Sequence, residues 1–170
     1  YSHLDLILAL RPMTSVTPSP SAAPAPTTDA RPTILVADDY PENRRLLYFY
    51  LRDAYRILEA ESAEEAIETL RNEHVDLAIM DLNFRDGMNG MEAAEVVRAD
   101  DALAHLPLLA LTAYAYPDDR RRCLEAGFTV YLSKPVFKLA MRDKVADLLS
   151  DADGGDGASS GDPTLWISKK

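Results

Sequence analysis

The chain has 170 residues, of which 47% are hydrophobic and 27% charged, and its formal net charge is −10 at pH 7. The acidic balance argues against direct nucleic-acid binding, and no apolar stretch reaches the roughly 18 residues that a membrane span needs. The single cysteine, Cys123, excludes an internal disulfide and a multi-thiol metal site, and it favours a reducing, cytoplasmic location.

Composition divides the chain into three parts. Residues 1–31 are predicted to be a disordered leader, because the Pro-, Ala-, Ser- and Thr-rich stretch 14–32 has no apolar face to bury. Residues 151–170 are predicted to be a flexible acidic tail, with docking of the small apolar cluster Leu165-Trp166-Ile167 as the alternative. Residues 32–150 are predicted to form one folded domain, large enough to bury its own core.

Within that domain, short apolar runs alternate with amphipathic patterns. In chain order the apolar runs, predicted as strands, are 34–37, 56–58, 77–80, 108–111 and 130–132. A helix is predicted after each strand: one begun by Pro41, one from Ser62, one over about 90–99, one between Pro117 and Gly127, and one that includes Phe137.

Two of these helices carry more specific expectations. Ser62 and Glu65 have the spacing of a capping box, in which each side chain bonds the backbone of the other residue. The last helix is predicted to bury one side, made of Phe137, Met141, Val145, Leu148 and Leu149.

The alternation predicts the fold class. Five strands separated by helices imply right-handed crossovers and a parallel α/β sheet that is doubly wound, with helices on both faces. Strands that are apolar along their whole length fit burial on both faces. In such sheets the functional crevice lies beyond the carboxyl ends of the strands.

Polar residues stand at those ends. Asp38 and Asp39 follow the first strand, Asp81 the third and Thr112 the fourth, and Lys134 follows the fifth. Three carboxylates in one crevice repel one another by about 3 kcal/mol per pair at a separation of ~5 Å and an effective dielectric of ~20. A cation is therefore expected among them, either Lys134 or a hard divalent ion, and Mg²⁺ suits oxygen ligands better than zinc does.

A metal and a phosphoryl donor would give this cluster a reaction. A carboxylate can act as a nucleophile and form an acyl phosphate, and Asp81 is the central candidate. Mg²⁺ is expected to bridge Asp39, Asp81 and one phosphoryl oxygen. The ammonium of Lys134 would pair with a second phosphoryl oxygen, and the Thr112 hydroxyl would donate to a third.

At these residues the sequence resembles the response-regulator receiver family. The resemblance covers about residues 32–149, and its motifs occur in the family's order. The matching segments are Ile34-Leu35-Val36-Ala37-Asp38-Asp39, Met80-Asp81-Leu82-Asn83, Ala110-Leu111-Thr112-Ala113, Glu125-Ala126-Gly127 and Tyr131-Leu132-Ser133-Lys134-Pro135. The resemblance implies a flavodoxin-like fold with five helices around a sheet of strand order 2-1-3-4-5.

The resemblance also implies roles for the carboxylates. Asp81 would be the phosphoacceptor. Asp39 would bind Mg²⁺ directly and Asp38 mainly through water, while the backbone carbonyl of Asn83 would be a further metal ligand. No nucleotide-binding loop is expected, since the chain has no Gly-rich phosphate motif.

Four residues on or just after the later strands receive implied roles as well. Thr112 and Lys134 would contact the phosphoryl group, and the bond between Lys134 and Pro135 would be cis, which proline permits at low cost. Tyr131 would be the aromatic residue that changes rotamer when Thr112 moves. The surface of the fourth helix, fifth strand and fifth helix would then change shape.

The implied partners are proteins. The phosphoryl group would come from a sensor histidine kinase or a phosphotransfer protein, and the output would be control of an unknown protein target. Homodimerisation on activation is a further option. We interpret the chain as a stand-alone regulator, with a receiver taken from a hybrid kinase or longer regulator as the alternative.

One segment departs from the family pattern. The family has a Met-Pro pair and then Asp-Gly shortly after the phosphoacceptor, whereas this chain has Phe84-Arg85-Asp86-Gly87-Met88-Asn89-Gly90, one residue longer and without the proline. The conformation of the loop and the dephosphorylation rate are therefore open. Asp86 is either an extra metal ligand or, as we favour, a solvated loop residue.

Two other functions fit parts of the pattern. An aspartyl phosphohydrolase of the haloacid-dehalogenase type also uses Asp, Thr, Lys and Mg²⁺, but it normally has a second aspartate where Asn83 stands and a cap domain. A degenerate receiver acting as a constitutive scaffold would need a defective site, yet every key residue is present. The chain is thus predicted to be a phosphoacceptor rather than an enzyme that turns over a substrate.

Overall fold

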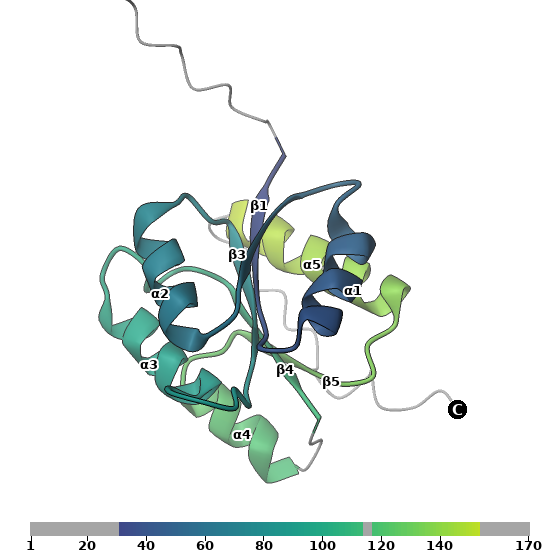
Figure 1. The fold of residues 1–170 in the computed structure, drawn as a ribbon. Coiled ribbons are helices and arrows are strands. Elements are labelled where there is room, and N and C mark those ends of the chain that lie inside the picture. The colour runs from purple at the N-terminus through teal and green to yellow at the C-terminus, as the bar shows by residue number, and fades with distance from the viewer. Residues whose placement is uncertain (1–30, 114–116, 154–170) are drawn as a thin grey trace, which may run out of the picture.

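A computed structural model describes residues 31–113 and 117–153, in which strands and helices alternate (Figure 1). The strands are β1 (Thr33–Ala37), β2 (Arg56–Ala60), β3 (Leu77–Asp81), β4 (Leu108–Thr112) and β5 (Val130–Ser133). The helices are α1 (Pro41–Leu51), α2 (Ala63–Asn72), α3 (Gly90–Ala99), α4 (Pro117–Glu125) and α5 (Lys138–Asp153). The strands are parallel in the order β2-β1-β3-β4-β5, which confirms the predicted fold class.

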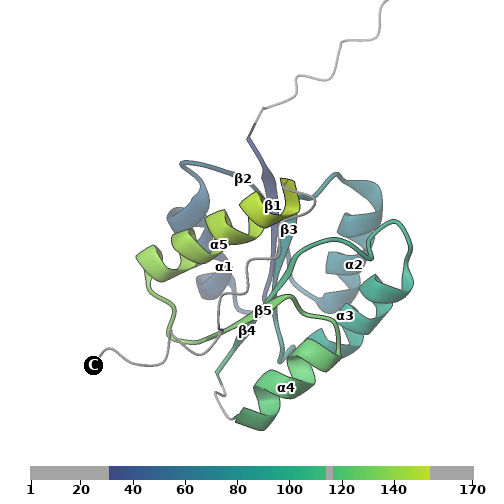
Figure 2. The ribbon, with the colours of Figure 1, turned by 180° about the vertical axis from the view of Figure 1, so that it is seen from behind.

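Helices cover both faces of the sheet. Figures 1 and 2 show α1 and α5 together on one side and α2, α3 and α4 on the other. Each strand residue points to the face opposite that of its neighbour. Leu35 of β1 therefore joins the core under α2 and α3, whereas Ile34 and Val36 join the core under α1 and α5.

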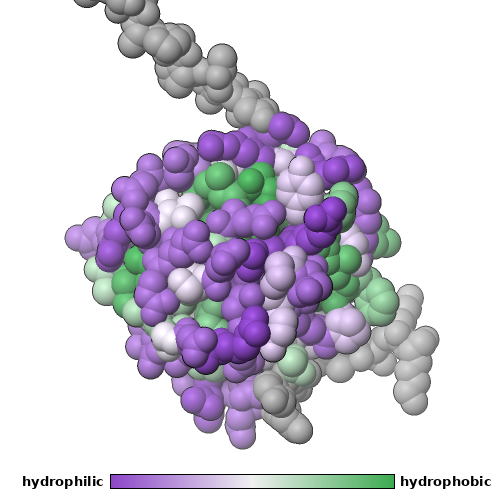
Figure 3. Space-filling model, viewed as in Figure 1, coloured by the Kyte–Doolittle hydropathy of each residue, from purple (hydrophilic) through white to green (hydrophobic). Residues whose placement is uncertain are grey.

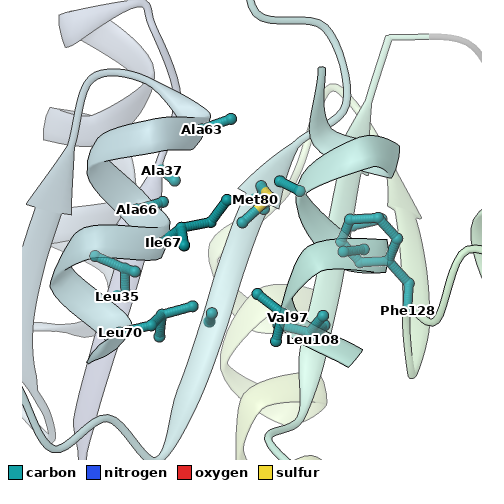
Figure 4. Packing of buried hydrophobic residues seen from close by; sticks show 14 of the residues in the cluster. Leu35, Ala37, Ala63, Ala66, Ile67, Leu70, Met80, Val97, Leu108 and Phe128 are labelled. Carbon is teal, nitrogen blue, oxygen red and sulfur yellow. The ribbon is translucent and has the colours of Figure 1, made fainter. Parts of the chain in front are cut away.

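The two cores explain why the strands are apolar throughout. Every residue of β1, β3 and β4 is buried, because each strand has a helix layer on both sides. Figure 4 shows Ile67 of α2 pointing toward Met80 of β3, while Leu70 lies further along the same helix. Cys123 of α4 is fully buried in the same core, so the lone thiol is shielded from solvent.

The strand register brings the carboxyl ends together. Ala37 of β1 pairs with Met80 of β3, so Asp38, which follows β1, and Asp81, the last residue of β3, lie side by side. Leu82 donates its backbone N–H to Leu111 at 3.0 Å, which fixes the end of β3 against β4. The polar residues that follow the strands thus line one edge of the sheet.

The capping box predicted for α2 is only half present. The Ser62 side chain accepts from the backbone N–H of Glu65, as expected. The Glu65 carboxylate, however, accepts from the backbone N–H of Glu61 at 2.6 Å and not from that of Ser62. The complete reciprocal box belongs to α3, where Asn89 and Glu92 each accept from the other's backbone.

The expectation for Phe137 is wrong. Helix α5 begins at Lys138, and Phe137 is 73% exposed just before it, while the preceding Val136 packs against the core. The helical spacing that puts Met141 and Val145 inside does not extend to a residue outside the helix. Phe137 instead supplies its carbonyl to the backbone N–H of Met141 at 3.0 Å.

The outer boundaries of the domain remain predictions. Helix α5 continues through Asp153, three residues into the predicted tail 151–170. The rest of that tail and the predicted leader up to residue 30 lie outside the described residues.

The face shown in Figure 3 is largely hydrophilic. Within the described ranges, no helix combines the length and apolarity needed to cross a membrane.

Candidate functional site

Three carboxylates converge at the ends of β1 and β3. Asp38, Asp39 and Asp81 each place an oxygen within 4.8 Å of the others. Asp38 is fully buried, Asp81 is 5% exposed, and the Asp39 side chain is 11% exposed. Within the described part of the chain, Oδ1 of Asp39 is buried and has no hydrogen-bond partner. Mg²⁺ prefers oxygen ligands, and this group offers several close carboxylate oxygens, one of them without a hydrogen-bond partner. The residues therefore fit this ion.

Lys134 links two of the carboxylates. Its Nζ donates to Oδ2 of Asp38 at 2.7 Å and to Oδ2 of Asp81 at 2.9 Å. Burial by itself would lower the pKa of Lys134, but the bonds to the two carboxylates outweigh it and raise the pKa. Burial raises the pKa of Asp81, against the opposing effect of Lys134. The ammonium is therefore held charged where the acidic groups are most crowded.

Thr112 and Tyr131 lie on the neighbouring strands. Thr112 is 1% exposed at the end of β4, and its carbonyl accepts from the backbone N–H of Lys134 at 2.7 Å. The Lys134–Pro135 peptide bond is cis. Tyr131 is partly buried on β5 against the core formed with α2 and α3, and this burial raises its pKa. Asn83 is exposed, and its backbone N–H donates weakly to Oδ1 of Asp81 at 3.4 Å.

Helix α1 positions Asp38 through residues that sequence reasoning missed. The Asn43 amide lies 3.0 and 2.9 Å from the two oxygens of Asp38, and the backbone N–H of Tyr40 donates at 2.9 Å. The buried Arg44 donates to the Asp38 carbonyl at 2.7 Å and to Glu61 at 2.6 Å. Polar residues are common in the first turn of a helix, so the sequence carried no distinctive signal for either role.

The lengthened loop contributes Arg85, which sequence reasoning also missed. Its Nε donates to Oδ2 of Asp39 at 2.6 Å, its backbone N–H donates to the same oxygen at 3.2 Å, and its Nη2 donates to the Asp39 carbonyl at 3.3 Å. The guanidinium lies 4.3 Å from the centre of the Tyr40 ring. Asp86 is exposed and lies outside the carboxylate group.

Known proteins are similar to this chain in sequence and in fold. The protein-family model of the response regulator receiver domain matches residues 34–146. The chain is 41% identical over 113 residues to the 14.6 kDa protein of the sodA1 3′ region of Leptolyngbya boryana, a match that covers 66% of this chain and 86% of that protein. It is 34% identical over 118 residues to the sensory/regulatory protein RpfC of Xanthomonas campestris, over 68% of this chain but only 16% of that protein.

A solved structure adds a likeness in three dimensions. The receiver domain of the sensor histidine kinase PA1611 of Pseudomonas aeruginosa, solved with a magnesium ion coordinated in its active-site cleft, has a TM-score of 0.66 and 27% identity to this chain. The match covers 71% of this chain and 98% of that one. The sheet order, the acidic residues at the strand ends and the match over most of the chain agree, and the chain belongs to the response regulator receiver domain family.

Proposed function

We propose that this receiver accepts a phosphoryl group on Asp81 from a sensor histidine kinase or a phosphotransfer protein, in a Mg²⁺-dependent reaction in the cytoplasm. The observation that carries the proposal is the ammonium of Lys134, shared between Asp38 and Asp81 with Asp39 alongside. The sensory and regulatory names of matched relatives support a kinase as the partner.

Asp39, Asp81 and the backbone carbonyl of Asn83 would hold the Mg²⁺ ion, with Asp38 contacting it mainly through water. The magnesium ion coordinated in the PA1611 receiver and the unpartnered oxygen of Asp39 support this assignment. When bound, the ion neutralises charge that gathers on the transferred group. Asp38 itself is already held by Asn43 and Lys134, which suits an indirect contact.

The residues of the chain carry the transfer. A carboxylate oxygen of Asp81 attacks the phosphorus, the bond from phosphorus to the donor breaks, and its electron pair leaves with the donor. Lys134 then exchanges one carboxylate contact for a phosphoryl oxygen, and the Thr112 hydroxyl donates to another. Because Asp81 is only 5% exposed, the donor must enter the crevice at the strand ends to reach it.

Incubation with acetyl phosphate and Mg²⁺ tests the proposal. Intact-mass analysis should show the gain of one phosphate in the wild type and none in Asp81→Ala, because the variant lacks the nucleophile. Asp86→Ala is the matched control: it removes an exposed carboxylate of the next loop and should leave the gain unchanged. Absence of labelling in the wild type would favour a constitutive scaffold, and sustained turnover of phosphate esters would favour a phosphohydrolase.

The proposal includes a switch that acts on a downstream protein. Thr112 and Lys134 gain phosphoryl contacts only in the modified state, and a few kcal/mol of such contacts inverts a two-state population. Movement of Thr112 would let Tyr131 turn inward and reshape the surface of α4, β5 and α5, which face the viewer in Figure 2. The reshaped surface would control the protein target and could also pair two receivers.

Beryllofluoride, a mimic of the phosphoryl group, should reveal this switch. With Mg²⁺ present, NMR chemical shifts of Tyr131 and of the β5 backbone should change, because the Tyr131 ring moves. Tyr48 on α1, outside the surface of α4, β5 and α5, serves as the internal reference and should change little. Changes restricted to the strand ends around Asp81 would contradict the switch while leaving phosphorylation intact.

A further inference from the structure

Arg85 forms a separate ion pair at the edge of the carboxylate cluster. Lys134 contacts Asp38 and Asp81, whereas the side-chain contact of Asp39 with a cation comes from Arg85. The two cations thus divide the three carboxylates between them. Neither Asp39 nor Arg85 lies on a regular element, so the pair joins the loop after β1 to the loop after β3.

Several contacts hold the Arg85 guanidinium in place. Nε and the backbone N–H both donate to Oδ2 of Asp39, Nη2 donates to the Asp39 carbonyl, and the guanidinium lies over the Tyr40 ring. The backbone contact requires an N–H at this position, which a proline would lack. A proline at position 85 would therefore remove both the guanidinium and the backbone donor from Asp39.

We propose that Arg85 is a counter-cation that weakens Mg²⁺ binding and so sets the metal concentration at which the receiver becomes competent. This inference rests on the proposed Mg²⁺ site. Arg85 occupies Oδ2 of Asp39 and leaves Oδ1 without a partner. If Arg85 stays in place, a divalent ion bound to Asp39 is repelled by the guanidinium charge. If Arg85 moves away to make room for the ion, its hydrogen bonds to Asp39 are lost. Both routes lower the affinity for the ion.

The charge of the side chain is the decisive property. Arg85 remains protonated at any physiological pH, and its pKa is raised further, chiefly by the hydrogen bond to Asp39. A neutral side chain of similar length keeps the loop solvated but removes the repulsion. Because the Arg85 side chain is 59% exposed, water screens part of the effect, and we expect a change of about threefold to tenfold in metal affinity.

Calorimetric titration with Mg²⁺ alone tests the proposal on the full chain. Arg85→Gln should bind Mg²⁺ about threefold to tenfold more tightly than the wild type, and Arg85→Lys, which keeps the charge, should stay closer to the wild type. Arg45→Gln is the matched control, because Arg45 is exposed and also lies over an aromatic ring, that of Phe49 at 5.4 Å. It removes the same charge away from the cluster and should leave the affinity unchanged.

Thermal unfolding with and without Mg²⁺ gives a second readout. A tighter site makes the ion raise Tm more, so the increase should be larger for Arg85→Gln than for the wild type. Equal or weaker Mg²⁺ binding by a folded Arg85→Gln, beside clear binding by the wild type, would overturn the role of Arg85. Absence of Mg²⁺ binding by the wild type and the variants alike would instead overturn the proposed metal site.

Discussion

Replacing Lys134 by methionine is expected to lower the free energy of unfolding by about 2–3 kcal/mol at pH 7 in the absence of divalent ions. The ammonium lies 2.7 Å from Asp38 and 2.9 Å from Asp81, and both carboxylates are buried. Without the ammonium, the two negative carboxylates repel each other with no positive charge between them. The expected loss is below that of a fully buried pair because the Lys134 side chain is 22% exposed.

This loss should depend on pH. The pKa of Lys134 is raised in the folded state, so its contribution is complete below the unfolded value of about 10.4 and disappears as the pH rises through the folded value. The pKa of Asp81 is also raised, so the carboxylate becomes neutral early on acidification, which removes the repulsion in the variant. The difference in the free energy of unfolding between the wild type and Lys134→Met should therefore become smaller at both acid and strongly alkaline pH.

Urea denaturation at several pH values measures the effect. Lys138→Met is the matched control, since Lys138 is exposed at the start of α5, and it should change the stability by less than about 0.5 kcal/mol. A deficit in Lys134→Met that stayed constant from acid to neutral pH would contradict the electrostatic origin of the effect.

Gly90→Ala is expected to destabilise the protein by about 2–4 kcal/mol, although alanine is the better helix former. A Cβ at Gly90 would lie 2.2 Å from the Asp81 carbonyl oxygen and 2.8 Å from Cα of Leu82. Both are backbone atoms, and the Gly90 N–H donates to the Leu82 carbonyl at 3.1 Å, so neither side can yield without moving the end of β3. The displaced residue would be Asp81.

Two measurements separate this clash from a general helix effect. Glu95→Ala changes an exposed position of the same helix and should leave the stability within about 0.5 kcal/mol of the wild type. Gly90→Ala should also slow phosphorylation by acetyl phosphate under conditions where the variant is still folded. A Gly90→Ala protein with wild-type stability and labelling would mean that α3 can shift away from β3 at little cost.

The elements that sequence reasoning predicted share a simple physical signal. Runs such as 34–37 and 77–80 are apolar without interruption because a parallel sheet is covered on both faces, and residues that favour turns bound them. The meeting of Asp38, Asp81 and Lys134 followed from the same pattern, since parallel strands present their carboxyl ends at one edge.

The parts that were missed depend on contacts between segments without periodicity. Arg85 lies in a loop, where no pattern says which carboxylate a charged side chain meets. Arg44 is buried under two acidic partners, whereas an arginine in a helix is ordinarily assumed to be solvated. Phe137 is apolar and close to a helical stripe, but the helix begins one residue too late to bury it.

The bridge from Asp38 to Lys134 spans 96 positions of the polypeptide, and that from Asp81 to Lys134 spans 53. No peptide excised around any single strand end can hold these groups together, because an unfolded chain keeps them far apart and closing such loops costs entropy. Any ligand of the cluster must consequently recognise the whole native molecule, and its binding energy adds to the cooperative stability of all the strands at once.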